Sequence, residues 1–193
     1  MKGIGRVIFV AGLPAAGKTT YAVHLAKNVG IPLLSKDAMK EHLHDALRYD
    51  PVDQETSHRY GAAAYEVFYY AARQVMCCRY PLILESNFPP QAAEVLRPML
   101  SQYGYQPLTL LFDADLNVLH KRFVERDHTP ERHAGLVSKS GIYEDFAVFS
   151  KAVLPLRDFS VGGVQKKVDT TNFENVDYPA LDQLVEHFLR TTG

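Results

Sequence analysis

The sequence has few cysteines, which bounds both its redox chemistry and its metal sites. Only Cys77 and Cys78 occur, and they are adjacent. Neighbouring cysteines seldom form a disulfide, and two thiols without a second pair of ligands do not make a zinc site. We therefore expect reduced thiols in a cytoplasmic protein.

The sequence also lacks a surplus of either charge and any long hydrophobic run. Lys and Arg number 21, Asp and Glu number 22, and the formal net charge is −1. Broad electrostatic binding to nucleic acid depends on a surplus of cations, so the balance argues against a nucleic-acid partner, although a local basic channel is compatible with it. No apolar run reaches membrane-spanning length, and no charged-then-apolar leader precedes the first expected strand. We expect no membrane partner.

What is present is an ordinary globular composition around one strong motif. The 193 residues are 47% hydrophobic and 22% charged, which favours a single domain over residues 1–193. Residues 12–19 match the pattern G-x-x-x-x-G-K-[ST]. The apolar run 6–11 before the motif predicts a strand, and Tyr21, Leu25 and Asn28 at helical spacing after it predict a helix. A strand, a glycine loop and a helix in this order are typical of a phosphate-binding loop.

Each residue type in the motif has a physical reason. Backbone N–H groups of such a loop form a concave anion site, and the helix N-terminus adds positive potential. Lys18 is expected at the β- and γ-phosphates and Thr19 in a Mg²⁺ shell. The absence of a guanine-reading N-K-x-D motif favours ATP over GTP, and Thr19 favours Mg²⁺, so we expect ATP and Mg²⁺ as cofactors. The expected nucleotide-binding residues are Gly12, Leu13, Pro14, Ala15, Ala16, Gly17, Lys18, Thr19 and Thr20.

Apolar periodicity in the remaining chain predicts alternating strands and helices. We expect strands over 31–35, 81–85, 106–112 and 166–169, a turn at 50–53, and helices over 37–48, 54–79, 91–103, 115–127 and 178–190. Pro98 should kink or split its helix. The alternation predicts an α/β fold with a parallel five-stranded sheet and helices on both faces. Ligands bind beyond the carboxyl ends of such strands, so segments 12–19, 35–37 and 85–87 should converge on one crevice.

Four segments in this order resemble a known group. The glycine loop, Leu34-Ser35-Lys36-Asp37, Ile83-Leu84-Glu85-Ser86-Asn87 and the arginine-rich stretch 122–133 are similar to those of small P-loop kinases of the zeta-toxin, chloramphenicol-phosphotransferase and polynucleotide 5′-kinase type. The likeness spans about residues 5 to 190. It implies a P-loop NTPase fold like that of nucleoside-monophosphate kinases, with a small arginine-rich lid at about 121–139 that closes over the phosphates.

The resemblance implies roles for two acids. Asp37 would lie beside the acceptor hydroxyl and accept its proton as the oxygen attacks the γ-phosphorus; the alternative is that Asp37 caps the helix that it begins. Glu85 stands where the superfamily often has an aspartate that orients the Mg²⁺ shell, and this departure leaves a contact with the acceptor open. Thr19 and Glu85 are the expected metal ligands.

The lid would supply cations for the transferred phosphoryl group, because guanidinium forks match phosphate oxygens. Arg126 and Arg132 are the expected lid residues, and with Lys18 and Asp37 they complete the expected catalytic set. Arg122 could face solvent instead. The competing interpretation of this stretch is a solvated helix face with ion pairs to its own acids, Glu125, Asp127 and Glu131.

Other polar and aromatic patterns are less specific. The tyrosines of the 54–79 helix are better explained by a packed face than by a stacking surface for bases. His42 and His44 point to different faces of their helix, so we expect no structural metal. Ser86 and Asn87 could donate hydrogen bonds to a substrate or form a simple turn. Residues 169–172 follow the last strand, where related kinases place a loop beside the adenine.

These features favour an ATP-dependent kinase that transfers the γ-phosphoryl group to a hydroxyl of a small-molecule acceptor. A nucleotide-dependent regulatory ATPase or switch is the main alternative, and within the kinase class a nucleic-acid 5′-hydroxyl kinase is another. A nucleotide-binding protein without catalysis is disfavoured, since Lys18, Thr19 and Asp37 are all present. The sequence specifies neither the acceptor nor the oligomeric state.

Overall fold

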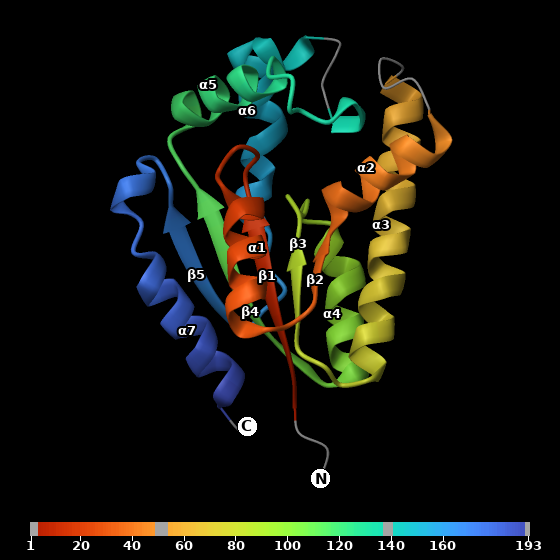
Figure 1. The fold of residues 1–193 in the computed structure, drawn as a ribbon, viewed down its shortest axis with the longest axis vertical. Helices are drawn as coiled ribbons and strands as arrows, with labels where there is room; N and C mark the ends of the chain where they lie inside the picture. The colour runs from red at the N-terminus through yellow and green to blue at the C-terminus, as the bar shows by residue number, and fades with distance from the viewer. Residues whose placement is uncertain (1–3, 49–53, 137–140, 192–193) are drawn as a thin grey trace.

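The computed structural model describes residues 4–48, 54–136 and 141–191. Its centre is a sheet of five parallel strands in the order β2-β3-β1-β4-β5 (Figure 1). The strands are β1 (Gly5–Gly12), β2 (Leu33–Ser35), β3 (Leu82–Glu85), β4 (Tyr105–Asp113) and β5 (Val164–Asp169). In the central register Phe9 pairs with Leu84 of β3 and with Thr109 of β4. The predicted α/β fold with a five-stranded parallel sheet is confirmed.

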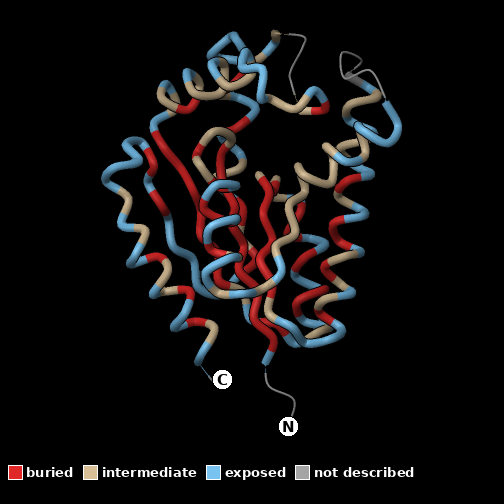
Figure 2. The backbone as a smooth tube through the Cα atoms, viewed as in Figure 1, coloured by how far each residue is buried: buried red, intermediate tan, exposed pale blue. Residues whose placement is uncertain are grey.

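Helices cover both faces of the sheet because successive side chains of a strand point to opposite faces. Phe9 of β1 packs among buried residues of α3 (Gln54–Cys77) and α4 (Ala92–Tyr103). Ile8 and Val10 pack on the opposite side, among residues of α1 (Lys18–Val29), α5 (Leu116–Asp127), α6 (Phe146–Val153) and α7 (Tyr178–Arg190). Figure 2 shows the burial concentrated in β1, β3 and β4 and on the inner sides of these helices.

Most predicted elements exist within a few residues of their expected bounds, and the largest differences lie after residue 127. Helix α2 runs over Lys36–Leu47. The short helices η1 (Ala134–Leu136), η2 (Ile142–Glu144), η3 (Leu154–Asp158) and η4 (Phe173–Asn175), together with α6, were not predicted. The expected turn at 50–53 lies outside the described residues, as does part of the expected lid, 137–139.

Pro98 does not split its helix. It lies inside the continuous helix α4, so the alternative of two helices is wrong. Leu96, Met99 and Leu100 around it are buried against the sheet. This apolar contact offsets the backbone hydrogen bond that a proline cannot donate.

The carboxyl ends of β1, β2 and β3 define the functional edge of the sheet. Helix α2 leaves this edge beside α3, while α5 and α6 lie above the end of β4 (Figure 1). Within the described residues, no helix is both long and apolar enough to span a membrane.

Candidate active site

The glycine loop connects β1 to α1 in the conformation that a phosphate-binding loop requires. Gly12 has φ +121°, and a Cβ there would lie 2.0 Å from the carbonyl oxygen of Phe112. Gly17 has φ +84° and precedes the first residue of α1. Ala15 also has a positive φ of 60°. Left-handed residues of this kind curl a loop so that successive N–H groups can face an anion, and Pro14, Ala15 and Gly17 line a cavity.

Lys18 is held inside this loop. Its side chain is buried and its Nζ donates a hydrogen bond to the carbonyl oxygen of Leu13 at 2.5 Å. Burial lowers the pKa of Lys18 to about 8, against the opposing attraction of Glu85 and Asp37. The ammonium group is therefore short of counter-charge in the absence of a ligand, and an anion in the loop would provide it.

Glu85 and Thr19 form an oxygen-rich corner beside the loop. The Thr19 hydroxyl donates to Oε1 of Glu85 at 3.1 Å, and the Ser35 hydroxyl donates to Oε2 at 2.6 Å. The carboxyl group is almost completely buried, and burial raises the pKa of Glu85 although Lys18 opposes the shift. A hydroxyl and a carboxylate next to a phosphate site are the ligand types that Mg²⁺ prefers, so these residues fit the ion.

Asp37 faces the same cavity from the first turn of α2. The helix cap is Ser35, whose side chain accepts a hydrogen bond from the N–H of Ala38. The Asp37 carboxylate instead lies 3.0 Å from Nζ of Lys36. Burial alone would raise the pKa of Asp37, but the cations Lys36, Lys18 and Arg132 outweigh it and lower the pKa. Asp37 is thus ionised at neutral pH and able to accept a proton.

Arg126 brings an unpaired donor to the cavity from the last turn of α5. Within the described part of the chain, its buried Nε–H has no hydrogen-bond partner. Burial and the nearby Arg132 lower the pKa of Arg126, whose planar side chain lies 5.6 Å from the ring of Phe123. Buried donors without partners are costly, and a phosphate oxygen is the acceptor that this position lacks.

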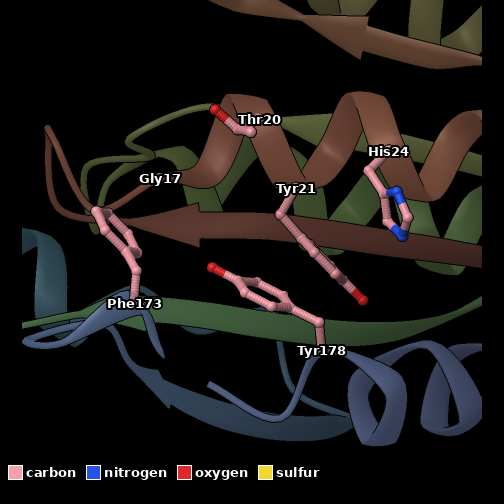
Figure 3. A pocket seen from close by; sticks show the side chains of 6 residues that line it. All are labelled: Gly17, Thr20, Tyr21, His24, Phe173 and Tyr178. Carbon is pink, nitrogen blue, oxygen red and sulfur yellow. The ribbon is translucent and has the colours of Figure 1, made fainter. Parts of the chain in front are cut away.

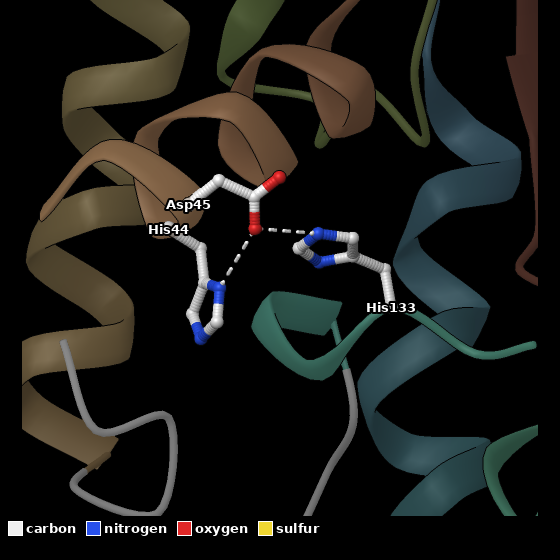
Figure 4. Close-up of side chains that lie close together, drawn as sticks. All are labelled: His44, Asp45 and His133. Carbon is white, nitrogen blue, oxygen red and sulfur yellow. Dashed lines mark hydrogen bonds and ion pairs between the residues drawn. The ribbon is translucent and has the colours of Figure 1, made fainter. Parts of the chain in front are cut away.

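Arg132 and His133 attach the segment after α5 to other parts of the fold. Arg132 forms an ion pair with Asp127 at 3.0 Å and donates to the carbonyl oxygen of Leu136. His133 contacts Asp45 of α2 at 3.0 Å, and His44 lies 3.4 Å from the same carboxylate oxygen (Figure 4). The described part of the arginine-rich segment therefore rests on α2, across the cavity from the glycine loop.

This cluster of His44, Asp45 and His133 brings three metal-ligating side chains within 4.8 Å of one another. The spacing of His42 and His44 alone did not predict it, because His133 comes from a distant segment. The N–H of Gly135 donates to Nδ1 of His133 at 3.1 Å. A neutral imidazole that accepts at Nδ1 carries its proton on Nε2. This tautomer lets Nε2 donate a hydrogen bond to Asp45, but a protonated Nε2 cannot bind a metal ion.

One cavity of about 130 Å³ collects most of the predicted site. Its lining residues are Pro14, Ala15, Gly17, Lys18, Thr19, Thr20, Asp37, Glu85, Asn87, Arg126 and Arg132. Of the predicted loop residues, Gly12, Leu13 and Ala16 do not line it, and the last two are completely buried in the core. Ser86 does not line it either, because its hydroxyl is bonded to that of Tyr65 at 2.9 Å.

Arg122 is not turned toward solvent, so that expectation is wrong. Its guanidinium donates to the carbonyl oxygens of Thr170 and Thr171 at 2.8 and 3.0 Å. It also lies 4.0 Å from the centre of the Phe173 ring. The contact joins α5 to the loop after β5. The sequence indicated only that residues 169–172 follow the last strand, and it did not predict their contact with Arg122.

A second cavity, of about 420 Å³, is lined both by the glycine loop and by the segment that follows β5. Gly17, Thr20, Tyr21, His24, Phe173 and Tyr178 line it (Figure 3). The rings of Tyr21 and Tyr178 stack with their centres 5.8 Å apart. Aromatic walls next to a phosphate site are suited to a planar base. Sequence reasoning missed these aromatic residues because they come from α1, η4 and α7.

Comparison with known proteins identifies the family. A family model described as an AAA domain matches residues 7–140. The chain belongs to this family. A candidate kinase from Chloroflexus aurantiacus is 31% identical, covering 97% of this chain and 100% of its own, with a TM-score of 0.83.

More distant structures agree in fold with this AAA-domain protein. A gluconokinase from Sinorhizobium meliloti matches 98% of this chain and 98% of its own, with 16% identity and a TM-score of 0.56. A shikimate kinase from Acinetobacter baumannii, solved with shikimate, matches 97% and 94% with 16% identity and a TM-score of 0.55. The fold of the chain is therefore that of the P-loop kinases.

Proposed function

We propose that the protein is an ATP-dependent kinase that transfers the γ-phosphoryl group to a hydroxyl of a small-molecule acceptor. The observation that carries the proposal is the meeting of Asp37 with Lys18, Glu85 and Arg126 around one cavity of about 130 Å³. A cation-lined phosphate loop, an oxygen-rich metal corner and an ionised acid are the parts that phosphoryl transfer requires.

The nucleotide would lie across the glycine loop. Its phosphates would accept hydrogen bonds from the loop N–H groups, from Lys18 and from Arg126, and its base would enter the cavity beside Phe173 and Tyr178. Thr19 and Glu85 would hold Mg²⁺, which supplies charge neutralisation for the phosphates when it is bound.

Asp37 would act on the acceptor. The acceptor oxygen attacks the γ-phosphorus while Asp37 takes the hydroxyl proton, and the bond from the γ-phosphorus to the β–γ bridging oxygen breaks to release ADP. Arg126 and Arg132 would stabilise the charge on the transferred phosphoryl group. Their position over the cavity would also keep water from competing with the acceptor.

Several observations favour a small-molecule acceptor. The cavity is small, and the chain carries no surplus of positive charge for a nucleic-acid strand. Two proteins that share the fold are named a gluconokinase and a shikimate kinase, and the most similar of the three structures compared is described as a candidate kinase.

The test is a coupled ADP-release screen over hydroxyl-bearing metabolites with the Asp37→Asn variant beside the wild type. We expect the variant to bind ATP within about threefold of the wild type and to lose about 10²-fold or more in transfer rate. Asp158→Asn is the matched control, because Asp158 is exposed and does not line the cavity.

Two results would contradict the proposal. Near-normal transfer by Asp37→Asn would remove Asp37 from the mechanism. ADP release that needs no acceptor and is unchanged in Asp37→Asn would favour a regulatory ATPase instead.

A further inference from the structure

Two lysines share one side of α2 next to Asp37. Lys36 and Lys40 are four residues apart, which makes them neighbours on the surface of a helix. Like charges at this spacing repel each other. Neither is a freely solvated surface lysine, since the Lys36 side chain is only 14% exposed and Lys40 is partly buried.

Only one of the two lysines has a carboxylate partner among the described residues. Asp37 lies 3.0 Å from Lys36, but Nζ of Lys40 donates to the neutral hydroxyl of Ser57 at 3.0 Å. Among residues 4–48, 54–136 and 141–191, no carboxylate lies within 4.0 Å of Lys40. Burial lowers the pKa of Lys40, and the charges of Lys36 and Arg132 lower it further, against the attraction of Asp37.

The pair lies outside the cavity around the glycine loop and next to α3. Lys36 stands 5.2 Å from the ring centre of Tyr65 on α3, and Ser57 is also on α3. Neither lysine lines the cavity around the loop, where Lys18, Arg126 and Arg132 would serve the phosphates. Helices α2 and α3 run next to each other at this edge (Figure 1). The lysines are therefore surplus to what the nucleotide needs.

From this surplus we propose that the acceptor is an anion, in which a carboxylate or a phosphate ester binds Lys36 and Lys40 while its hydroxyl lies at Asp37. The inference rests on the proposed function, because it names the substrate class of the same site. An acceptor with a negative group would otherwise be repelled by Asp37, and the two ammonium groups would offset that repulsion. Charge-assisted hydrogen bonds of this kind are among the strongest in proteins.

The experiment compares matched acceptors that differ in the anionic group. One arm measures ADP release with gluconate against glucitol and with glycerate against glycerol. The other uses glucose 6-phosphate against glucose. We expect the anionic member of at least one pair to have the higher kcat/KM by about 10²-fold, since a neutral acceptor would leave the two partly buried ammonium groups without their charged partner. The arm that responds distinguishes a carboxylate from a phosphate ester.

A variant then tests the lysine directly. Lys40→Gln should raise KM for the anionic acceptor by about tenfold or more, with kcat within about threefold, and should leave KM for the neutral partner unchanged. Lys27→Gln, an exposed lysine of α1, is the matched control. A merely structural role for Lys40, through its bond to Ser57, would change both acceptors alike.

The outcomes separate the two proposals. Equal use of neutral and anionic acceptors, or a Lys40→Gln effect that is the same for both, overturns this inference and leaves the kinase assignment intact. ATP binding without acceptor-dependent ADP release from any compound counts against the proposed function, and against this inference with it.

Discussion

The glycine-loop side and the α2 side of the cavity are built in different ways. We call them the nucleotide side and the acceptor side after their proposed roles. Every residue of β1 is buried, and α1 buries Lys18, Tyr21, Ala22 and Leu25. Helix α2, which carries Asp37, has no buried residue at all. The side that would hold the phosphates is thus fixed by the core, whereas the side that would hold the acceptor is attached by partly exposed polar contacts and a few apolar ones.

This difference suits a kinase fold that serves many acceptors. Contacts such as Lys40 with Ser57 and His133 with Asp45 can be exchanged without disturbing the sheet. Elements with few buried apolar contacts also open at low free-energy cost, which substrate entry requires. The comparison therefore predicts that stability is set on the nucleotide side and substrate choice on the acceptor side.

The largest effect we expect is on stability, from a core substitution in β1, the strand that leads into the glycine loop. Phe9 is fully buried and packs against Phe88 and Phe159 with ring centres 5.6 and 5.9 Å away. Phe9→Ala should lower the free energy of unfolding by about 3–5 kcal/mol. Met39→Ala, on the partly buried face of α2, should cost no more than about 1.5 kcal/mol. Urea unfolding measures both, and equal losses would refute the asymmetry.

The second effect is on catalysis, from the lid arginine with the unpaired buried donor. Arg126→Gln should reduce the transfer rate by about 10²-fold, because it removes the cavity-lining charge that we propose stabilises the transferred phosphoryl group, while stability changes little. Single-turnover kinetics with the accepted substrate measures the rate. Arg190→Gln, an exposed arginine of α7 paired with Glu186, is the control and should be silent. A rate within threefold of wild type would exclude Arg126 from charge stabilisation.

The same asymmetry explains what the sequence could predict. The β1 strand and the glycine loop were predictable because backbone conformation and burial are encoded locally, in apolar runs and in Gly12 and Gly17. The sheet followed from the alternation of elements. Asp37 and Glu85 were placed through their positions after strands, where parallel strand ends must meet.

The remainder of the site depends on contacts between distant segments. Lys40 meets Ser57, His133 meets Asp45, and Arg122 meets Phe173, and no local pattern encodes these pairs. Helix α6 had a local signal that sequence reasoning missed, since Phe146, Phe149 and Val153 stand at helical spacing. What could not be predicted is therefore mainly on the acceptor side and in the lid.

The smallest effect is a pH dependence that acts in opposite directions on stability and on ATP affinity. The pKa of Lys18 is about 8 in the folded protein without nucleotide, below its ordinary value of 10.5. Between these values the unfolded chain holds more protons, so the Lys18 contribution to stability should increase as pH rises from 8 to 10.5. Bound phosphates favour the charged ammonium and raise its pKa, so ATP affinity should fall by up to about tenfold per pH unit above 8.

Calorimetry in buffers of different ionisation enthalpy checks this prediction. Near pH 8 and above, ATP binding should take up a fraction of a proton that approaches one as pH rises, and Lys18→Met should abolish both the uptake and the added pH dependence of the dissociation constant. An affinity that stays constant from pH 7 to 9.5 in the wild type would mean that Lys18 keeps its charge in the empty loop. Glu85 and Asp37 would then neutralise the Lys18 ammonium as fully as Lys36 neutralises the Asp37 carboxylate.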